Sequence, residues 1–258
     1  MYGNHQVSIC ESRCTGCGEC VRDCPNYCLF LSQGKARYRA ELCIACGHCL
    51  AVCPQGAVSI SGFDAAEIHP ASSYCPDPDA LLAAMESRRS VRRFQKKPIP
   101  RPMLEKLIQA GRYSPTARNK QGLSYVVLEA ALAPAQQAAL SYFRQPEIGP
   151  AILYSGADAA ALPEDFFFKG AAAAILICGR NKIDAGLAAS KMETLALSLG
   201  LGVFYSGFFT YAADGCASLR ALLGLAEGDK PAATLVLGWP DVHYLRTAPR
   251  EKARVTWL

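Results

Sequence analysis

The sequence lacks a strong net charge of either sign. Its 258 residues carry 27 Lys and Arg against 22 Asp and Glu, and the formal net charge of +5 is mild for a chain of this length. Charged residues make up 19% of the chain and apolar residues 51%, the opposite of the balance in disordered chains. We therefore expect a folded protein, and because its attraction for nucleic acid is weak we predict no nucleic-acid partner.

Targeting and membrane signals are missing as well. The first ten residues, MYGNHQVSIC, have no basic segment followed by an apolar run, so nothing resembles a secretory signal and a cytoplasmic location is expected. Residues 194–213 form an uncharged stretch of twenty residues, long enough to span a bilayer. Three glycines interrupt it, and the break at Gly200 and Gly202 indicates a buried helix that runs into a buried extended segment. We predict no membrane association.

Fingerprints for nucleotide-binding loops are also missing. A dinucleotide-binding loop needs three spaced glycines that follow a strand. Here Gly200 and Gly202 follow a predicted helix, and Tyr205 stands where the third glycine is required. The sequence has no Walker-type phosphate loop either. Any cofactor must therefore be held by a different arrangement.

Cysteine, by contrast, is abundant, with thirteen in the chain. Reducing compartments do not keep structural disulfides, so these thiols need another role. Residues 14–25 read CTGCGECVRDCP and residues 43–54 read CIACGHCLAVCP. Both have the spacing Cys-x2-Cys-x2-Cys-x3-Cys-Pro, and each cysteine of the first segment recurs 29 positions later. The sequence therefore contains an internal duplication.

This spacing is typical of proteins that hold two [4Fe-4S] clusters. Three cysteines at two-residue intervals wrap around one face of a cubane, while Gly16, Gly18 and Gly47 let backbone amides approach the sulfurs. The fourth cysteine lies too far along the chain to close the same site, and in the bacterial arrangement it crosses to the other cluster. We assign the first cluster to Cys14, Cys17, Cys20 and Cys53, and the second to Cys43, Cys46, Cys49 and Cys24.

Tetrahedral zinc is the alternative, because zinc sites also use Cys-x2-Cys pairs. They do not need a third cysteine two residues on or a Cys-Pro after three more, so the spacing favours the clusters. His48 lies between ligands and is expected to be a surface residue near the second cluster. Five cysteines outside the pattern are expected to be buried or partly buried thiols: Cys10, Cys28, Cys75, Cys178 and Cys216.

Length and composition favour a small domain followed by a larger one. We place the cluster domain at residues 1–62, a linker at residues 63–78, and the second domain at residues 79–258. Asp77 and Pro78 predict a helix start, with a carboxylate cap before a proline in the first turn. That helix is expected to end near Arg88 or Arg89 and to bury Leu81, Leu82 and Met85.

Further elements of the second domain follow from apolar periodicity. Helices are expected over residues 102–113 and 184–199, and buried strands over residues 124–130, 171–179 and 232–238. Helices that alternate with a few strongly apolar strands indicate a layered fold of helices and sheet. Phe166 to Phe168 either pack the core or line a channel, and we favour the core.

Two resemblances extend this interpretation. Residues 1 to about 62 resemble a two-cluster bacterial ferredoxin. Residues 79–258 resemble the nitroreductase family of FMN-dependent, dimeric α+β enzymes, through segments that occur in the family's order: SRRSVRRF at 87, SPTARNKQ at 114, FFFKGAAAAILI at 166, DAGLAASKMETLALSLGLG at 184, KPAATLVLGWP at 230 and PREKARVTW at 249. The predicted fold is therefore α+β, with a small ferredoxin-like two-[4Fe-4S] domain followed by a nitroreductase-like α+β sandwich.

The resemblance implies a set of FMN contacts. In that family the segment matching SRRSVRRF binds the FMN phosphate and ribityl chain, and planar guanidinium groups suit a compact phosphate. Arg93 is expected to be a surface charge, Asn119 could instead be a turn residue, and Arg250 could be a solvated tail charge. Gly122 departs from the proline of many relatives, which weakens the match next to Gln121. The implied contacts are Arg88, Arg89, Ser90, Arg92, Asn119, Gln121, Tyr205, Ser206, Gly207, Arg250 and Lys252.

The combined features predict an iron-sulfur flavoprotein oxidoreductase. The clusters would feed single electrons to FMN, which would reduce a small conjugated electrophile of the nitroaromatic or quinone type. A homodimer is implied, and the fused cluster domain favours a redox protein or ferredoxin-type donor over NAD(P)H. We identify no catalytic acid or base. Lys191 and Glu193 lie on the predicted helix over residues 184–199, where such residues are more often structural than catalytic. The alternatives are an electron-transfer module that serves a protein partner and an iron-sulfur nucleic-acid binder.

Overall fold

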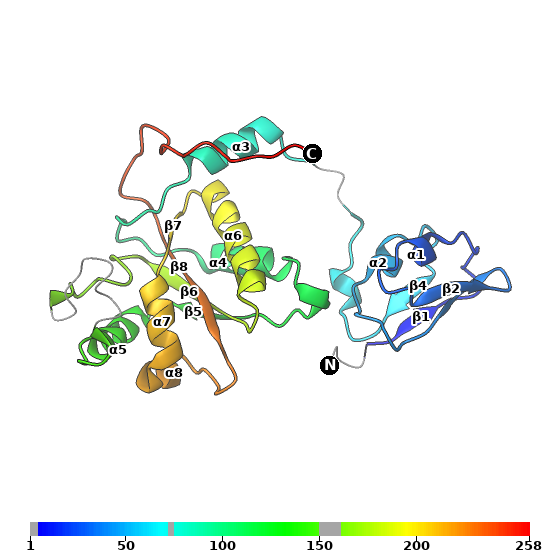
Figure 1. Ribbon diagram of the computed structural model, residues 1–258, viewed down its shortest axis with the longest axis horizontal. Coiled ribbons are helices and arrows are strands. Elements are labelled where there is room, and N and C mark those ends of the chain that lie inside the picture. The colour runs from blue at the N-terminus through cyan, green and yellow to red at the C-terminus, as the bar shows by residue number, and fades with distance from the viewer. Residues whose placement is uncertain (1–4, 72–74, 150–160) are drawn as a thin grey trace. The chain divides into compact units, whose positions relative to one another are not determined.

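The computed structural model divides the chain into two compact units, shown in Figure 1. The first unit comprises Met1–Tyr74 and Thr116–Gln121, and the second comprises Cys75–Pro115 and Gly122–Leu258. The structure describes residues 5–71, 75–149 and 161–258.

The predicted linker, residues 63–78, contains the short 3-10 helix η1 (Ala65–Glu67) and reaches the start of the first helix of the second unit. The side chain of Asp64 caps η1 by accepting a hydrogen bond from the Ala66 amide at 2.9 Å. Residues 72–74 of the predicted linker lie outside the described residues.

The first unit is built from two similar halves. Each half runs strand, cysteine loop, short helix, strand: β1 (Val7–Ile9), α1 (Glu19–Arg22) and β2 (Leu29–Ser32), then β3 (Lys35–Tyr38), α2 (His48–Ala51) and β4 (Val58–Ile60). β1 pairs with β4 and β2 pairs with β3, both antiparallel. Because each pair joins one strand from each half, the halves form one core and cannot be separated.

The conformation of the cysteine loops depends on glycine at specific positions. Gly18 and Gly47 precede α1 and α2 with φ of 80° and 77°, a left-handed conformation that other residues adopt at a cost. Gly16 is also left-handed, at 72°, and a Cβ there would lie 2.1 Å from the carbonyl oxygen of Gly34. The position 29 residues later holds Ala45, which adopts a φ of 50°. The first loop therefore needs glycine at residue 16 for space as well as for φ.

The second unit has a four-stranded sheet in the order β5-β6-β8-β7, with all neighbouring strands antiparallel. The strands are β5 (Ser124–Leu128), β6 (Ala173–Cys178), β7 (Gly202–Tyr205) and β8 (Pro231–Gly238). This confirms the three predicted strands and the extended segment expected after Gly200. The mixture of helices and an antiparallel sheet confirms the α+β class.

Helices cover both faces of this sheet. Successive side chains of β6 alternate between two cores: Ile175 and Ile177 face one, and Ala174 and Leu176 face the other. The first core includes residues of α4 (Arg101–Arg112) and α6 (Lys182–Ser198). The second includes residues of α5 (Leu132–Phe143), α7 (Gly207–Gly215) and α8 (Ala217–Leu222). Since both faces are covered, every residue of β6 is buried.

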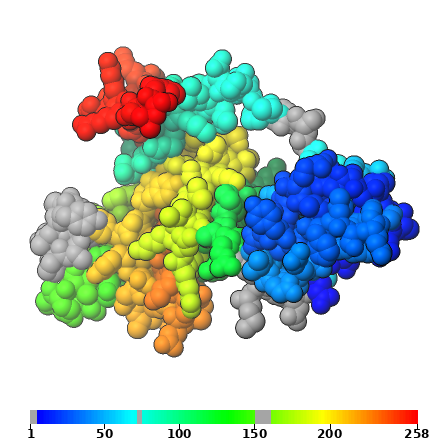
Figure 2. Space-filling model, turned by 45° about the vertical axis from the view of Figure 1, so that its right-hand side comes forward, coloured from blue at the N-terminus to red at the C-terminus, as the bar shows by residue number. Residues whose placement is uncertain are grey.

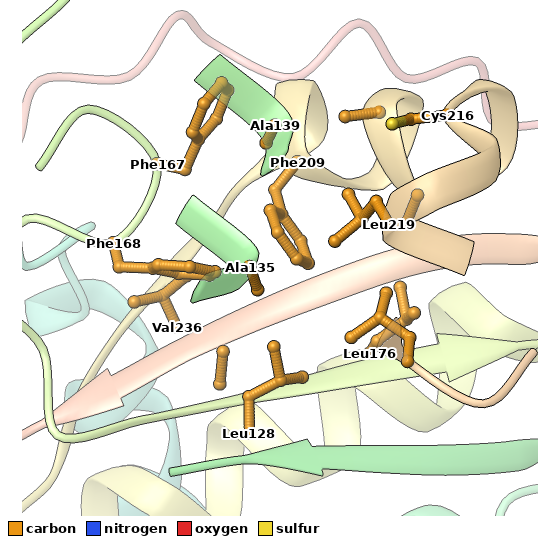
Figure 3. Packing of buried hydrophobic residues seen from close by; sticks show 14 of the residues in the cluster. Leu128, Ala135, Ala139, Phe167, Phe168, Leu176, Phe209, Cys216, Leu219 and Val236 are labelled. Carbon is orange, nitrogen blue, oxygen red and sulfur yellow. The ribbon is translucent and has the colours of Figure 1, made fainter. Parts of the chain in front are cut away.

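The second core is rich in aromatic residues. Figure 3 shows Phe168 and Phe209 packed close together above Val236 of β8, and their ring centroids lie 4.7 Å apart. Phe167 and Phe168 are 1% and 4% exposed, and Phe166 packs against the same cluster. The interpretation of this aromatic run as core packing is confirmed.

Helix α3 (Pro78–Ser87) begins where the sequence predicts, because Asp77 accepts a hydrogen bond from the Ala80 amide at 2.7 Å and Pro78 fills the first turn. The expectation that it buries an apolar face is wrong for the single chain. Leu82 and Met85 are 54% and 50% exposed, and Leu81 is only partly buried. Apolar spacing indicates that a face is suited to burial, but it does not say what covers it.

The chain beyond β8 follows an extended path over the second unit. Figures 1 and 2 both show this C-terminal segment, in red, beside α3. It carries exposed apolar side chains, among them Val255 at 59% and Trp257 at 90%. Among the residues that the structure describes, no helix combines the length and apolar character needed to cross a membrane.

Candidate functional site

Each predicted set of four cysteines surrounds its own cavity in the first unit. One cavity is lined by Cys14, Cys17, Cys20 and Cys53, and the other by Cys24, Cys43, Cys46 and Cys49. Each encloses about 360 Å³ including its open mouth. In both, the fourth cysteine comes from the other half of the repeat, so the two chain segments cross in the way the spacing indicates.

Backbone amides point at the cysteine sulfurs of both cavities. The sulfurs of the crossing cysteines, Cys24 and Cys53, each accept a hydrogen bond from the backbone amide four residues later, that of Cys28 and that of Ala57, at 3.2 Å. Cys14 accepts from Ala36 at 3.4 Å, and Cys43 accepts from Ala45 at the same distance. Amide donors of this kind stabilise negative charge on sulfur, which is what thiolate ligands of iron require.

The thiols respond to these surroundings in opposite ways. The amides of Ala36 and Gly16 lower the pKa of Cys14. Burial, and then the neighbouring Cys46, raises the pKa of Cys49 to about 11, and burial likewise raises that of Cys20. Four thiolates in one cavity therefore repel one another until cations neutralise them. The donor set fits a cluster that takes up four thiolates and releases their protons.

The same cysteines do not converge on one point. In the part of the chain that the structure describes, no group of three or more His, Cys, Asp or Glu side chains is arranged around a single metal ion. In a cubane each cysteine binds a different iron, so the four sulfurs stand farther apart than the ligands of one ion. The two cavities, each lined by four cysteines, agree with that requirement.

The remaining cysteines and His48 mostly match expectation. Cys28, Cys178 and Cys216 are buried and Cys10 is partly buried, but Cys75 is exposed, which corrects its prediction. Cys75 follows the linker and precedes Asp77, where the chain has not yet entered a core. His48 is exposed and lines the cavity of Cys43, Cys46 and Cys49.

In the second unit, the arginine-rich segment runs along β7. Ser90 forms a parallel bridge with Val203, and the Val91 amide donates to the Val203 carbonyl at 3.0 Å. This close approach needs Gly202, because a Cβ there would lie 2.7 Å from the side chain of Val91. The segment therefore extends the sheet edge and fixes where its arginines begin.

The arginines of this segment have different surroundings. Arg89 lies over the ring of Tyr244, with its guanidinium carbon 5.8 Å from the ring centroid. The guanidinium carbon of Arg92 lies 6.0 Å from the ring centroid of Phe204. Both Arg92 and Arg93 are exposed. The surface position expected for Arg93 is confirmed, but Arg92 shares it.

Arg88 forms an ion pair that the sequence did not predict. Its Nη1 donates to Oε1 of Glu193 on α6 at 3.0 Å. The hydroxyl of Tyr205, at the end of β7, donates to Oε2 of the same carboxylate at 3.3 Å. Glu193 is only 8% exposed, and burial followed by the charge of Glu193 raises the pKa of Tyr205 well above its usual range. The structural role expected for Glu193 therefore includes holding two of the predicted FMN contacts.

The turn between β7 and α7 contains the other two contacts predicted in this region. The Ser206 amide donates to the Thr234 carbonyl at 3.0 Å, and its side chain is buried. Gly207 begins α7, is exposed, and has open space where a side chain would be. Arg88, Ser90, Tyr205, Ser206 and Gly207 are therefore gathered around one end of β7.

Asn119 and Gln121 belong to the first unit, with residues 116–121. The side-chain amide of Asn119 donates to the carbonyls of Ile44 and Ala45 at 3.2 and 3.0 Å. Arg118, Asn119 and Gln121 all have positive φ, between 49° and 55°. Asn119 is thus a turn residue, the alternative that we kept open. Its side-chain amide donates to the loop that carries Cys43 and Cys46. Gln121 is exposed, as are Arg250 and Lys252 in the C-terminal segment.

Two family models match the chain. A model described as the nitroreductase family matches residues 85–239. A model described as a 4Fe-4S dicluster domain matches residues 13–57, which contain the eight cysteines of the two repeated motifs. A curated relative from Methanothermobacter thermautotrophicus, named as an NADH dehydrogenase/NAD(P)H nitroreductase, is 24% identical over 169 residues. The match covers 62% of this chain and 77% of that protein.

Solved structures with a similar fold are also found. A nitroreductase with bound FMN from Bacteroides fragilis aligns with a TM-score of 0.58 at 18% identity, covering 69% of this chain and 98% of that one. A nitroreductase with bound FMN from Desulfitobacterium hafniense aligns with a TM-score of 0.55 at 20% identity, covering 69% and 97%. At these identities the similarity is one of fold.

Proposed function

Because this chain belongs to the nitroreductase family, we propose that it is an iron-sulfur flavoprotein that passes electrons from two [4Fe-4S] clusters through FMN to a small conjugated electrophile, such as a nitroaromatic or a quinone. The observation that carries the proposal is the pair of four-cysteine cavities in a chain whose larger part is a nitroreductase domain. FMN suits such an arrangement because, when bound, it accepts electrons singly and delivers them in pairs.

The residues at the end of β7 fit the phosphate end of FMN. Arg88 keeps guanidinium N–H groups beyond the one given to Glu193, and Arg89 and Arg92 add positive charge nearby along the segment. Gly207 leaves the backbone at the start of α7 uncovered, which suits close approach of a flavin edge. Arg250 and Lys252 are the contacts proposed in the C-terminal segment, and Asn119 and Gln121 remain predicted FMN contacts.

We further propose that the protein is a homodimer. Leu82 and Met85 of α3 and Val255 and Trp257 of the C-terminal segment leave a substantial apolar surface exposed in the single chain. Surfaces of this kind mark interaction sites in folded proteins. A second copy would cover them and explain why the apolar side chains of α3 stay exposed among the described residues of a single chain.

The electron donor is proposed to be a reduced one-electron carrier, although the relative above is named for NAD(P)H. NAD(P)H would deliver a hydride directly to the flavin, so two clusters that carry single electrons would not be needed on that route. Within the chain itself, the described residues supply no acid or base that could be assigned to substrate protonation, and solvent is the proposed proton source.

An anaerobic analysis of cofactor content tests the proposal. The purified protein should contain about eight irons, about eight acid-labile sulfides and about one FMN per chain. Chemical reduction of the clusters should be followed by reduction of a nitroaromatic or quinone faster than free FMN achieves. A protein with zinc in place of iron, or with no flavin, would contradict the cofactor assignment. Intact cofactors without turnover of any small acceptor would favour a module that serves a protein partner.

A further inference from the structure

The two halves of the first unit differ in charge around their cavities. Four basic residues lie near the cavity of Cys14, Cys17, Cys20 and Cys53, which we call the first cavity: Arg13, Arg22, Lys35 and Arg37. In the other half of the repeat, the equivalent positions hold Leu42 for Arg13, Ala51 for Arg22, Gln6 for Lys35 and Ser8 for Arg37. The duplication therefore kept the cysteines and not the cations.

Contacts place these cations at the first cavity. Arg22 Nη1 donates to the Cys17 carbonyl at 3.4 Å, and Lys35 Nζ donates to the Cys14 carbonyl. Lys35 and Arg37 lie on β3 on either side of Ala36, whose amide donates to the Cys14 sulfur at 3.4 Å. Arg13 is exposed, and its Nη1 lies 3.7 Å from the position a Cβ on Gly56 would take, three residues beyond Cys53.

Acidic residues only partly offset this charge. Glu19 pairs with Arg22 and Glu11 pairs with Arg37, which leaves Arg13 and Lys35 in excess. Near the second cavity, Asp23 and Glu41 are accompanied by Arg39, whose guanidinium carbon lies 4.8 Å from the ring centroid of Phe30. Arg118 and Lys120 add positive charge there, because they flank the Asn119 that donates to the cysteine loop. The first cavity is thus bordered by net positive charge from residues of the cysteine repeat itself, whereas most of the cations near the second cavity come from residues 116–121.

The first cavity also lies closer to solvent at one ligand. Cys17 is exposed, whereas Cys46, its counterpart 29 residues later, is partly buried. Electron transfer between proteins slows steeply with distance, so an exposed ligand edge favours exchange with a docked partner. Positive charge around that edge attracts a negatively charged partner and raises its rate of association.

We propose that the basic border of the first cavity is the docking surface for an acidic ferredoxin-type electron donor. The inference rests on the proposed function, since it presumes a cluster in that cavity. One electron leaves the donor's reduced iron-sulfur centre, which is oxidised, and the first cluster is reduced by that electron; no bond or proton changes place. The second cavity, whose Cys46 is partly buried, is the less accessible entry point for such a donor.

The repeat supplies a matched control. Arg13→Gln with Arg22→Gln removes two positive charges from the first cavity. Leu42→Glu with Ala51→Glu lowers the net charge by the same amount at the equivalent positions of the second cavity. The readout is the dissociation constant of the holoprotein for an oxidised, acidic bacterial two-cluster ferredoxin, measured by calorimetry at about 20 and about 200 mM NaCl. A basic haem protein of similar size serves as the oppositely charged probe.

Binding of the acidic ferredoxin to the wild type should weaken by about tenfold or more between the two salt concentrations. At low salt the arginine variant should bind about tenfold more weakly than the wild type, and the control pair should differ by less than about twofold. Wild-type binding that ignores salt, equal losses in both variants, or tighter binding of the basic probe would each overturn the inference.

Failure of the inference can be told apart from failure of the proposed function. Reduction by methyl viologen needs no docking surface, so both variants should accept electrons from it at the wild-type rate. A wild-type protein without iron or flavin would overturn the proposed function itself. Normal cofactors and viologen reduction, together with salt-independent ferredoxin binding, would overturn only the docking surface.

Discussion

Arg88 on the segment beside β7 and Glu193 on α6 form an ion pair of 3.0 Å whose carboxylate is almost completely buried. Removing one partner of such a pair leaves a charge without compensation, which costs more than removing both. In flavin-free protein, Arg88→Ala should therefore lower the free energy of unfolding by about 2 kcal/mol, a value reduced from fully buried pairs because Arg88 is partly exposed.

The double variant Arg88→Ala with Glu193→Gln should recover part of that loss. Both tryptophans, Trp239 and Trp257, belong to the second unit, so urea unfolding followed by tryptophan fluorescence reports on it. A double variant no more stable than Arg88→Ala would show that the pair contributes nothing specific.

Tyr205 gives a pH-dependent contribution to stability. Burial first, and the charge of Glu193 second, raise the pKa of its hydroxyl in the folded protein. The stability from the neutral hydroxyl is thus fully present below the unfolded pKa of about 10 and declines above it, because only the unfolded state ionises there. Tyr205→Phe should be about 1 kcal/mol less stable than the wild type at pH 8. That difference should shrink above about pH 10, and a constant difference would contradict this account.

Gly16 and Gly47 separate the two effects of glycine in the cysteine loops. Both have positive φ, but only at Gly16 would a Cβ meet backbone, at 2.1 Å from the Gly34 carbonyl. Gly16→Ala should therefore prevent assembly of the first cluster, leaving about four irons per chain, whereas Gly47→Ala should retain about eight. Iron and sulfide counts on anaerobically purified protein decide the matter, and equal losses in both variants would show that φ alone is limiting.

The crossing cysteines predict that loss of the last cysteine of one motif removes the cluster held mainly by the other motif. Cys24 follows the first motif but lines the cavity of Cys43, Cys46 and Cys49. Cys24→Ala should abolish the second cluster and spare the first, as judged by iron content and low-temperature electron paramagnetic resonance of the reduced protein. Cys28→Ala is the control, because Cys28 is buried beside the same cavity outside the motif and its loss should spare both clusters.

Gly111 lies where α4 packs against α6 and β5. A Cβ there would come within 2.7 Å of the Tyr125 hydroxyl and 2.9 Å of the Met192 sulfur. Gly111→Ala should therefore destabilise the second unit by about 1–3 kcal/mol. Gly186, on the exposed side of α6, has open space, so Gly186→Ala should stabilise it by about 0.5–1 kcal/mol. Urea unfolding monitored by fluorescence compares the two, and a neutral Gly111→Ala would show that the packing can relax.

Local patterns predicted the strongly apolar elements correctly. β6 and β8 are buried on both faces, so their composition alone marks them, and α4 shows the spacing of Leu104, Leu107 and Gly111. Helices α5, α7 and α8 were not predicted. Alanine in α5 favours helix but gives no distinct apolar stripe, whereas α7 is rich in aromatic residues and depends on tertiary packing to be helical.

The sequence by itself indicated the iron-sulfur chemistry and predicted which eight cysteines hold the clusters, because their repeated spacing is typical of two-cluster domains. It also determined the family, through short segments in a fixed order. Only the tertiary structure decided the surroundings of those residues: Glu193 meets Arg88 although they are 105 positions apart, and the described residues leave Leu82 and Met85 of α3 exposed. The physical reason is that ligand spacing is a property of a short loop, whereas burial and charge pairing depend on which distant elements pack together.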